Sequence, residues 1–213
     1  EVLFNQFLQN GLQVAHNPSK PGNGTVVVNT CGFIGDAKEE SINMILDFAK
    51  AKEEGKIKEL VVMGCLSERY RDDLVKEIPE IDRIYGKFDW KGLIKDMKLD
   101  HKVTFDPLNR KVTTPAHYAY IKVSEGCDRT CSFCAIPLMT GKHKSRAKED
   151  IYAEIKALVA SGVKEFQLIA QDMSSYGTDL YKSAELASLV EGISDIPGVE
   201  RIRLHYLYPA RFP

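Results

Sequence analysis

Two short hydrophobic segments, each running directly into a cysteine-bearing loop, constrain the fold more than any other feature of the sequence. They read "TVVVNTCGF" (25–33) and "IKELVVMGCLS" (57–67), and both are rich in the β-branched residues that favour strands. A helical pattern follows each of them. Because strands that alternate with helices pair in parallel, this part of the chain predicts an α/β domain built on a parallel sheet.

The segment between these two strands has the spacing of a helix. Within "DAKEESINMILDFAKAKEEG" (36–55), Asp36 and Glu39 have the spacing of a capping box, and Gly55 is a stop signal. Apolar residues recur at helical intervals, at Ile42, Ile45, Leu46 and Ala49. We therefore expect a helix here, with Asp36 as its N-cap.

The alternation resumes after an irregular stretch that is rich in proline and charge. Strand-like "YAYIKVSEG", "VKEFQLIAQD" and "VERIRLHYLY" alternate with helical "AKEDIYAEIKALVASG" and "SAELASLVEGIS". This pattern predicts a first domain over 1–97, a linker over 98–117 and a second domain over 118–213. A closed (β/α)8 barrel takes about 250 residues, so we expect the second domain to be only the first half of a barrel.

Composition narrows the class of protein. The chain has 29 Lys+Arg against 30 Asp+Glu, so no global basic field favours nucleic acid. No apolar run approaches the roughly 18 residues that span a bilayer, and no signal-peptide pattern opens the chain. The five cysteines are sparse and odd in number, which favours reduced thiols over a disulfide scaffold. We expect a soluble cytoplasmic protein, without membrane contact, whose cysteines bind metal or catalyse.

Three of the cysteines lie close together in "SEGCDRTCSFCAIP" (124–137), with the spacing Cys127-x3-Cys131-x2-Cys134. Thiolates select zinc, copper(I) or iron–sulfur clusters. Spacing alone leaves two ligand sets open. His143 could complete a Cys3His zinc site, or the three cysteines could hold a cluster that keeps one iron open for a substrate or cofactor.

The x3/x2 spacing, with Phe133 before the last cysteine, is typical of the radical S-adenosylmethionine (SAM) superfamily. Together with "GKHKSR" (141–146), "LIAQD" (168–172) and "NTCGFIGDAKEES" (29–41), it resembles the radical SAM methylthiotransferases, most closely those that modify a ribosomal-protein aspartate. The resemblance covers nearly the whole chain. It implies a flavodoxin-like domain, incomplete at its start, then part of a radical SAM (β/α) barrel. The rest of the barrel and a C-terminal TRAM domain would lie outside this sequence.

The resemblance also assigns residues. It implies that Cys127, Cys131 and Cys134 hold a [4Fe–4S] cluster whose open iron binds SAM, with no catalytic residue beyond the clusters. The residues implied to bind SAM lie around this loop and at the next strand end: Phe133, Ile136, Pro137, Arg146, Gln171 and Asp172. For Phe133, Ile136 and Pro137 the alternative is a purely core-packing role. For Arg146 it is a solvated basic loop, and for Gln171 and Asp172 it is simple loop capping. Tyr176, in the same strand-to-helix loop, is either a ligand contact or a packed aromatic residue.

A second [4Fe–4S] cluster is implied for the N-terminal domain. Cys31 in "NTCGF" and Cys65 in "MGCLS" match two of its three ligands, and the third is expected before the start of this sequence. Both cysteines follow predicted strands, at the sheet edge where ligands of open α/β folds bind. The alternative is a pair of ordinary buried thiols.

The activity that the resemblance implies is the transfer of a methylthio group to the β-carbon of an aspartate in a small-subunit ribosomal protein. It requires two [4Fe–4S] clusters, SAM and an electron donor. One alternative is the sister enzyme that modifies an adenosine in tRNA, but those enzymes tend to read "GQN" where this chain reads "AQD" (170–172). The other is a non-catalytic iron–sulfur or zinc module of the translation apparatus. We expect a ribosomal protein as partner, and not tRNA.

Overall fold

The computed structural model describes residues 1–18, 22–99 and 110–209 of the chain, so half of the predicted linker (98–117) lies outside the described residues. The chain divides into two compact units. The N-terminal unit comprises Gln6–Lys102 with Phe133–Met139, and the C-terminal unit comprises Glu1–Asn5, Val103–Ser132 and Thr140–Pro213. The first helix, α1 (Val2–Gln9), contributes residues to both units.

The N-terminal unit is built on the predicted parallel sheet. Its strands are β1 (Thr25–Thr30), β2 (Glu59–Gly64) and β3 (Arg83–Tyr85), in the order β1-β2-β3. Both pairs are parallel, which confirms the α/β prediction for this part of the chain. The central strand β2 is buried from its second residue onward, as expected for a strand covered on both faces. The sequence reading did not include β3, because three residues are too few to show a periodicity.

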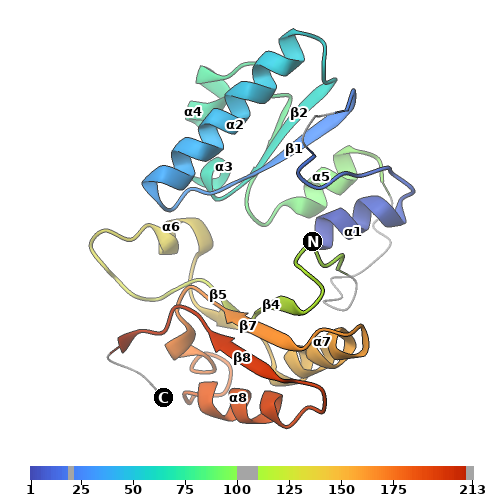
Figure 1. Ribbon diagram of the computed structural model, residues 1–213. Coiled ribbons are helices and arrows are strands. Elements are labelled where there is room, and N and C mark those ends of the chain that lie inside the picture. The colour runs from blue at the N-terminus through green and yellow to red at the C-terminus, as the bar shows by residue number, and fades with distance from the viewer. Residues whose placement is uncertain (19–21, 100–109, 210–213) are drawn as a thin grey trace. The chain divides into compact units, whose positions relative to one another are not determined.

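Helix α2 (Gly35–Glu53) lies along this sheet, as Figure 1 shows. Its N-cap is Ile34, without a side-chain cap, so the predicted capping by Asp36 is wrong, and Asp36 lies in the first turn. The buried stripe is Ser41, Ile45 and Ala49. Ile42 and Leu46, two of the four apolar residues at helical intervals, are 38% and 47% exposed. The narrow three-stranded sheet covers only the buried row of i, i+4 positions, and the neighbouring rows remain exposed. The unit is completed by α3 (Cys65–Arg69), α4 (Arg71–Glu77) and α5 (Trp90–Asp96).

The C-terminal unit carries the second predicted sheet. Strands β4 (Tyr118–Lys122), β7 (Glu165–Ile169) and β8 (Arg201–Leu204) are parallel, in the order β4-β7-β8. The predicted helices are α7 (Lys148–Ala160) and α8 (Leu186–Ser194), which contact each other and the sheet (Figure 1). This β/α alternation confirms the prediction for the second half of the chain.

The two faces of the C-terminal sheet differ. Ala119, Ile121, Phe166 and Leu168 point into a core shared with α7 and α8. The intervening residues are largely polar, and Glu165 on this other face pairs with Arg203 at 2.6 Å. A parallel sheet covered by helices on both sides would be apolar on both faces. This alternation instead suits a strip of barrel wall, with helices outside and polar groups inside.

Short elements follow β4 and β7 in the chain, and two of them form a separate two-stranded sheet. An antiparallel pair joins β5 (Ser124–Glu125) to β6 (Lys144–Ser145), α6 (Ile136–Thr140) lies between them in sequence, and the 3-10 helix η1 (Met173–Ser175) follows β7. Strand alternation could not reveal the β5–β6 pair, since each strand has two residues. Among the described helices, none has the length and apolar character needed to cross a membrane.

Candidate functional site

The strand register of the N-terminal unit brings Cys31, in the loop after β1, close to Cys65, the first residue of α3 after β2. Thr30 on β1 pairs with Gly64 on β2, so each cysteine lies one residue beyond a paired position. A Cβ atom on Gly32 would lie 2.7 Å from the carbonyl oxygen of Cys65, which shows that the two backbones approach closely. The two predicted ligands of the second cluster therefore lie in adjoining segments at one sheet edge. The expected loop position is wrong for Cys65, which begins α3 directly after β2.

Glycine makes this approach of the two strand ends possible. Gly64 has φ +115°, a conformation that residues with a side chain rarely adopt. A Cβ atom there would lie 2.5 Å from the carbonyl oxygen of Thr30 and 2.8 Å from its nitrogen. The glycine of "MGCLS" is thus required both by its backbone angle and by the neighbouring strand.

Ser41 on α2 fixes the position of the Cys31 loop. Its hydroxyl accepts a hydrogen bond from the Cys31 backbone N–H at 3.0 Å and donates to the Ala37 carbonyl at 2.8 Å. The side chain is buried. Sequence reasoning missed this residue, although a serine four residues before Ile45, in line with the buried stripe, is the signal that could have revealed it.

In the C-terminal unit, the cysteine-bearing loop is closed at its base. The pair β5–β6 joins its two ends, and the Cys127 N–H donates to the Gly141 carbonyl at 3.2 Å. Gly126 has φ +77°, and a Cβ atom there would collide with the backbone of Lys142. The sequences "SEG" and "GKHKS" therefore form the neck of this loop.

The three clustered cysteines differ in their surroundings. All are free of disulfides; Cys127 is buried, Cys131 is exposed and Cys134 is intermediate. The Arg129 N–H points at the Cys127 sulfur at 3.5 Å. Cys134 belongs, with Phe133, to the segment that groups with the N-terminal unit. Within the described ranges, no three His, Cys, Asp or Glu side chains are gathered closely enough to hold a metal ion.

The predicted SAM-binding residues of the segment after the loop are accessible. Phe133 is 89% exposed, and Ile136 and Pro137 at the start of α6 are partly exposed. They do not form part of either described core cluster. The structure therefore contradicts the alternative that these three side chains pack in a core.

Gln171 has one amide atom engaged and one free of protein partners. Its Nε2 donates to Glu125 Oε1 at 2.5 Å. Because a carboxylate only accepts, this contact fixes the amide orientation and turns Gln171 Oε1 away from Glu125. That oxygen is buried and accepts no hydrogen bond from any described residue. It is an acceptor at the carboxyl end of β7 that lacks a donor.

Asp172 and Arg146 are already engaged with charged or polar partners. Asp172 is buried, and its Oδ2 accepts from Arg129 Nε at 2.7 Å and from Ser175 Oγ at 2.7 Å. Arg146 Nη1 donates to the Lys122 carbonyl at 2.7 Å and lies 2.8 Å from Glu154 Oε2 on α7. Both side chains thus help to hold their own loops.

Tyr176 and His143 are buried rather than open to a ligand. Tyr176 is a fully buried member of the core, and its hydroxyl donates to the Arg146 carbonyl at 2.8 Å. Burial raises the pKa of this hydroxyl, which keeps it protonated as a donor. Of the two alternatives for Tyr176, the structure shows the packed aromatic residue. His143 Nε2 lies 3.1 Å from Ser145 Oγ.

Buried polar atoms without a hydrogen-bond partner concentrate at this edge of the C-terminal unit. In the described part of the chain they include Ser124 Oγ, Arg129 Nη2, His143 Nδ1, Arg146 Nη2, Gln171 Oε1, Asp172 Oδ1 and Asp179 Oδ1. Buried polar groups in proteins almost always have partners, so a concentration of unpaired ones marks a place for a polar ligand. The chemistry of three disulfide-free thiols suits an iron–sulfur cluster, and that of these donors and acceptors suits SAM, although the three thiols are not gathered around one point in the described structure.

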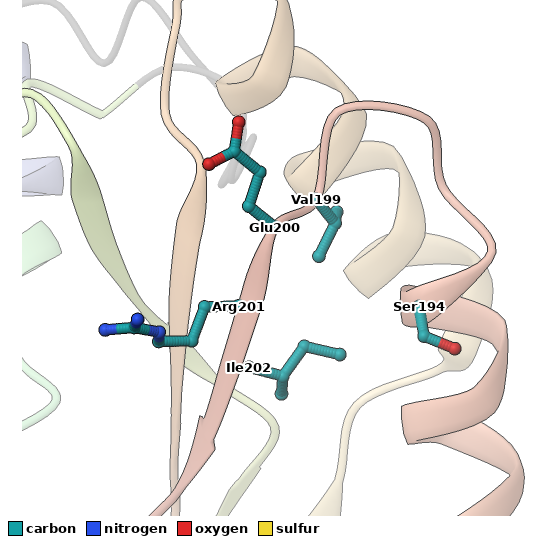
Figure 2. A pocket seen from close by; sticks show the side chains of 5 residues that line it. All are labelled: Ser194, Val199, Glu200, Arg201 and Ile202. Carbon is teal, nitrogen blue, oxygen red and sulfur yellow. The ribbon is translucent and has the colours of Figure 1, made fainter.

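A separate cavity lies at the opposite edge of the C-terminal sheet. Figure 2 shows its lining, which is Ser194, Val199, Glu200, Arg201 and Ile202, around about 230 Å³. It adjoins the amino end of β8, whereas ligands of open α/β sheets bind beyond the carboxyl ends. It contains no thiol or other soft metal ligand, and we do not assign it to the site.

Two family models match separate parts of the chain. Residues 1–86 match the family described as "Uncharacterized protein family UPF0004", and residues 121–210 match the radical SAM superfamily. Among solved structures, the radical SAM methyltransferase TsrM from Kitasatospora setae has a TM-score of 0.50 at 13% identity, covering 79% of this chain and 40% of that chain. The cobalamin-dependent SAM radical enzyme OxsB also has a TM-score of 0.50 at 13% identity, covering 87% and 30%. At these identities the likeness shows the fold alone.

Curated relatives are much more similar. Proteins named "Ribosomal protein uS12 methylthiotransferase RimO" are 59% identical in Phocaeicola vulgatus, 58% in Bacteroides fragilis and 46% in Cytophaga hutchinsonii. Each match covers 100% of this chain and 48–49% of the relative. The chain thus spans about half the length of these relatives. Matched along its whole length by such proteins, the chain belongs to the radical SAM methylthiotransferase family.

Proposed function

We propose that the protein transfers a methylthio group to the β-carbon of an aspartate in ribosomal protein uS12. The observation that carries this proposal is 59% identity along the whole chain to a protein named for that activity. The geometry supports it, because the loop of Cys127 and Cys131 and the unpaired acceptor of Gln171 lie at the carboxyl edge of one β/α unit. A catalytic role therefore suits this chain better than a purely structural metal module.

For the first site, we propose Cys127, Cys131 and Cys134 as ligands of a [4Fe–4S] cluster. When bound, such a cluster supplies the electron that cleaves SAM and so starts radical chemistry on the substrate. The side chains of this protein would bind SAM and orient it. Gln171 Oε1 is suited to accept a hydrogen bond from the SAM amino group, and Arg146 Nη2 is suited to donate to the SAM carboxylate.

The apolar side chains of the same segment are proposed to pack on SAM. Phe133, Ile136 and Pro137 offer accessible apolar surface next to Cys134. Binding would exclude water from this surface and so contribute to SAM affinity. The family resemblance also places Asp172 at SAM. Its side chain is engaged by Arg129 and Ser175, so we propose instead that it holds the cysteine loop.

For the second site, we propose Cys31 and Cys65 as two ligands of another [4Fe–4S] cluster, with a third ligand outside these 213 residues. Support comes from the strand register and from the contact of Gly32 with the Cys65 carbonyl, which bring the two cysteine-bearing segments together. We also propose a domain boundary within residues 98–117, an electron donor as a further partner, and the cytoplasm, where ribosomes are found, as the location.

Mass spectrometry of the natural substrates tests the activity. Full-length enzyme, reconstituted anaerobically with iron and sulfide and supplied with SAM and a reductant, should add a methylthio group to an aspartate of uS12. Omitting SAM should abolish the addition. Bulk tRNA treated in parallel should remain unmodified, and a methylthio mark found only in tRNA would favour the adenosine-modifying sister enzyme.

Metal analysis separates the enzyme from a non-catalytic module. Anaerobically purified full-length protein should contain iron and sulfide and show the broad visible absorption of iron–sulfur clusters. Reduction in the presence of SAM should release 5′-deoxyadenosine. Stoichiometric zinc with no visible absorption would instead support the zinc module.

A further inference from the structure

Arg129 lies between two of the proposed cluster ligands, in "CDRTC", and is held from both sides. Its Nε donates to Asp172 Oδ2 at 2.7 Å. Its guanidinium carbon lies 3.6 Å from the ring centroid of Tyr208, within cation–π range. Its own backbone N–H points at the Cys127 sulfur. One residue therefore links the sulfur of a proposed ligand to two other segments of the same unit.

Asp172 is built to hold this arginine. It is 3% exposed, and its Oδ2 also accepts from Ser175 Oγ in η1. A buried carboxylate is stable only when paired, and removal of one partner leaves an uncompensated buried charge. The pair with Arg129 therefore constrains the conformation of the cysteine loop by its charge as well as by its geometry.

The aromatic partner is fixed by the same short helix. The Tyr208 N–H donates to Ser174 Oγ at 2.8 Å, which places its ring against the guanidinium. Three segments thus meet on Arg129: the cysteine loop, η1 after β7, and the chain after β8. A side chain held in this way has little freedom to turn toward solvent, and 23% of it is exposed.

We propose that Arg129 and Asp172 are positioning residues that hold the cysteine loop in its ligating conformation and set the electrostatic potential at the cluster. The inference rests on the proposed function. It gives the aspartate of "AQD" a role toward the cluster through Arg129, in place of a direct contact with SAM or with the substrate. Outer-shell partners of this kind typically change metal affinity or activity by roughly tenfold to a hundredfold when removed.

The charges of the pair make a signed prediction for the reduction potential. Reduction adds negative charge to a cluster, so a nearby positive charge raises the potential and a negative charge lowers it. In the full-length reconstituted enzyme, Arg129→Gln should lower the potential of the SAM-binding cluster, and Asp172→Asn should raise it. The double variant removes both charges and should return close to the wild-type potential.

The experiment is a redox titration followed by electron paramagnetic resonance, combined with iron content and the KM for SAM. Both single variants should lose iron more readily, whereas KM for SAM should change less than about twofold, because uniform SAM binding is not touched. Asp195→Asn, which removes an exposed carboxylate at the end of α8, is the matched control and should shift none of these quantities.

Several outcomes would overturn the proposal: no shift in potential, shifts of the same sign in both single variants, or a rise in KM for SAM in Asp172→Asn without a change in potential. If Asp172→Asn retains too little iron for titration, recovery of iron in the double variant supports the pair, and failure to recover contradicts it. Wild-type enzyme that holds no cluster or does not cleave SAM would refute the proposed function itself, which keeps the two failures distinguishable.

Discussion

Both units place cysteines at the carboxyl edge of a three-stranded parallel sheet, yet they hold those cysteines by different means. In the N-terminal unit, Cys31 and Cys65 directly follow the paired residues Thr30 and Gly64, and contact between the two segments is between backbones. In the C-terminal unit, side chains from other segments hold the loop, chiefly through the Arg129–Asp172 ion pair. Strand register thus places two proposed ligands without charged residues, whereas a long loop needs side-chain partners to reduce its freedom.

The two units should also be separable in function, and this is the largest effect we expect. Cys131→Ala removes a proposed ligand of the SAM-binding cluster, so the full-length enzyme should form neither 5′-deoxyadenosine nor methylthiolated product. Cys65→Ala should still form 5′-deoxyadenosine but no methylthiolated product, because Cys65 lies at the start of α3 and is a proposed ligand of the other cluster. Both products are measured separately after anaerobic reduction. Loss of SAM cleavage in Cys65→Ala as complete as in Cys131→Ala would refute two independent cysteine sets.

Backbone placement in the N-terminal unit predicts strong sensitivity at Gly64. Gly64→Ala introduces a Cβ atom 2.5 Å from the Thr30 carbonyl oxygen at a residue with positive φ. We expect a loss of roughly 3 kcal/mol in the free energy of unfolding, from strain and overpacking together. Gly55→Ala is the matched control, since Gly55 has φ +70° with open space around it, and should cost only about 1 kcal/mol. Urea unfolding measures both, and equal losses would show that the close approach is not what requires glycine.

Replacing Ser41 tests how much a side-chain hydrogen bond contributes to the stability of the same unit. Ser41→Ala removes the acceptor of the Cys31 N–H and leaves that donor unpaired, so we expect a loss of about 1–2 kcal/mol. Ser194 at the end of α8 bonds only the Glu191 carbonyl of its own helix and is exposed, so Ser194→Ala should change stability by less than about 0.5 kcal/mol. Thermal or urea unfolding distinguishes the two. Equal effects would argue against anchoring of the Cys31 loop by Ser41.

The smallest expected effect concerns acid stability. Two described carboxylates in each unit have a lowered pKa: Glu54 and Asp82 in the N-terminal unit, and Asp179 and Glu185 in the C-terminal unit. For Asp82, burial raises the pKa, but hydrogen bonds from Lys52 and the Leu60 N–H outweigh it and hold the pKa below its usual value. For Asp179, burial likewise raises the pKa. Hydrogen bonds from the Ser145 side chain and backbone outweigh this effect and hold the pKa below its usual value.

Since the folded-state pKa is lowered, each group contributes stability fully above the unfolded pKa of about 4, and this contribution is lost as pH falls through the folded value. Asp82→Asn and Asp179→Asn should each flatten the decline of unfolding free energy between about pH 5 and pH 2. Asp195→Asn, whose carboxylate is exposed, is the control. A variant whose acid profile matches the wild type would show that its carboxylate does not contribute.

Local patterns in the sequence determined much of this protein. Alternating β-branched and amphipathic segments predicted both parallel sheets, because strand and helix periodicity reflect local burial. The cysteine spacing with Phe133 identified the superfamily, because the spacing of residues on one loop is a local property. The same patterns misjudged the start of α2, where Ile34 precedes the first turn, and did not reveal that Ser41 occupies the buried row.

Only the tertiary structure decided which distant residues meet. Nothing in the spacing of "CDRTC" and "AQD" shows that Arg129 pairs with Asp172 across 43 residues of chain, or that Ser41 bonds the Cys31 backbone. Such contacts depend on strand order, on register and on the path of each loop. The physical reason is that propensity and periodicity act over a few residues, whereas the pairing of buried polar groups is settled by which elements pack together.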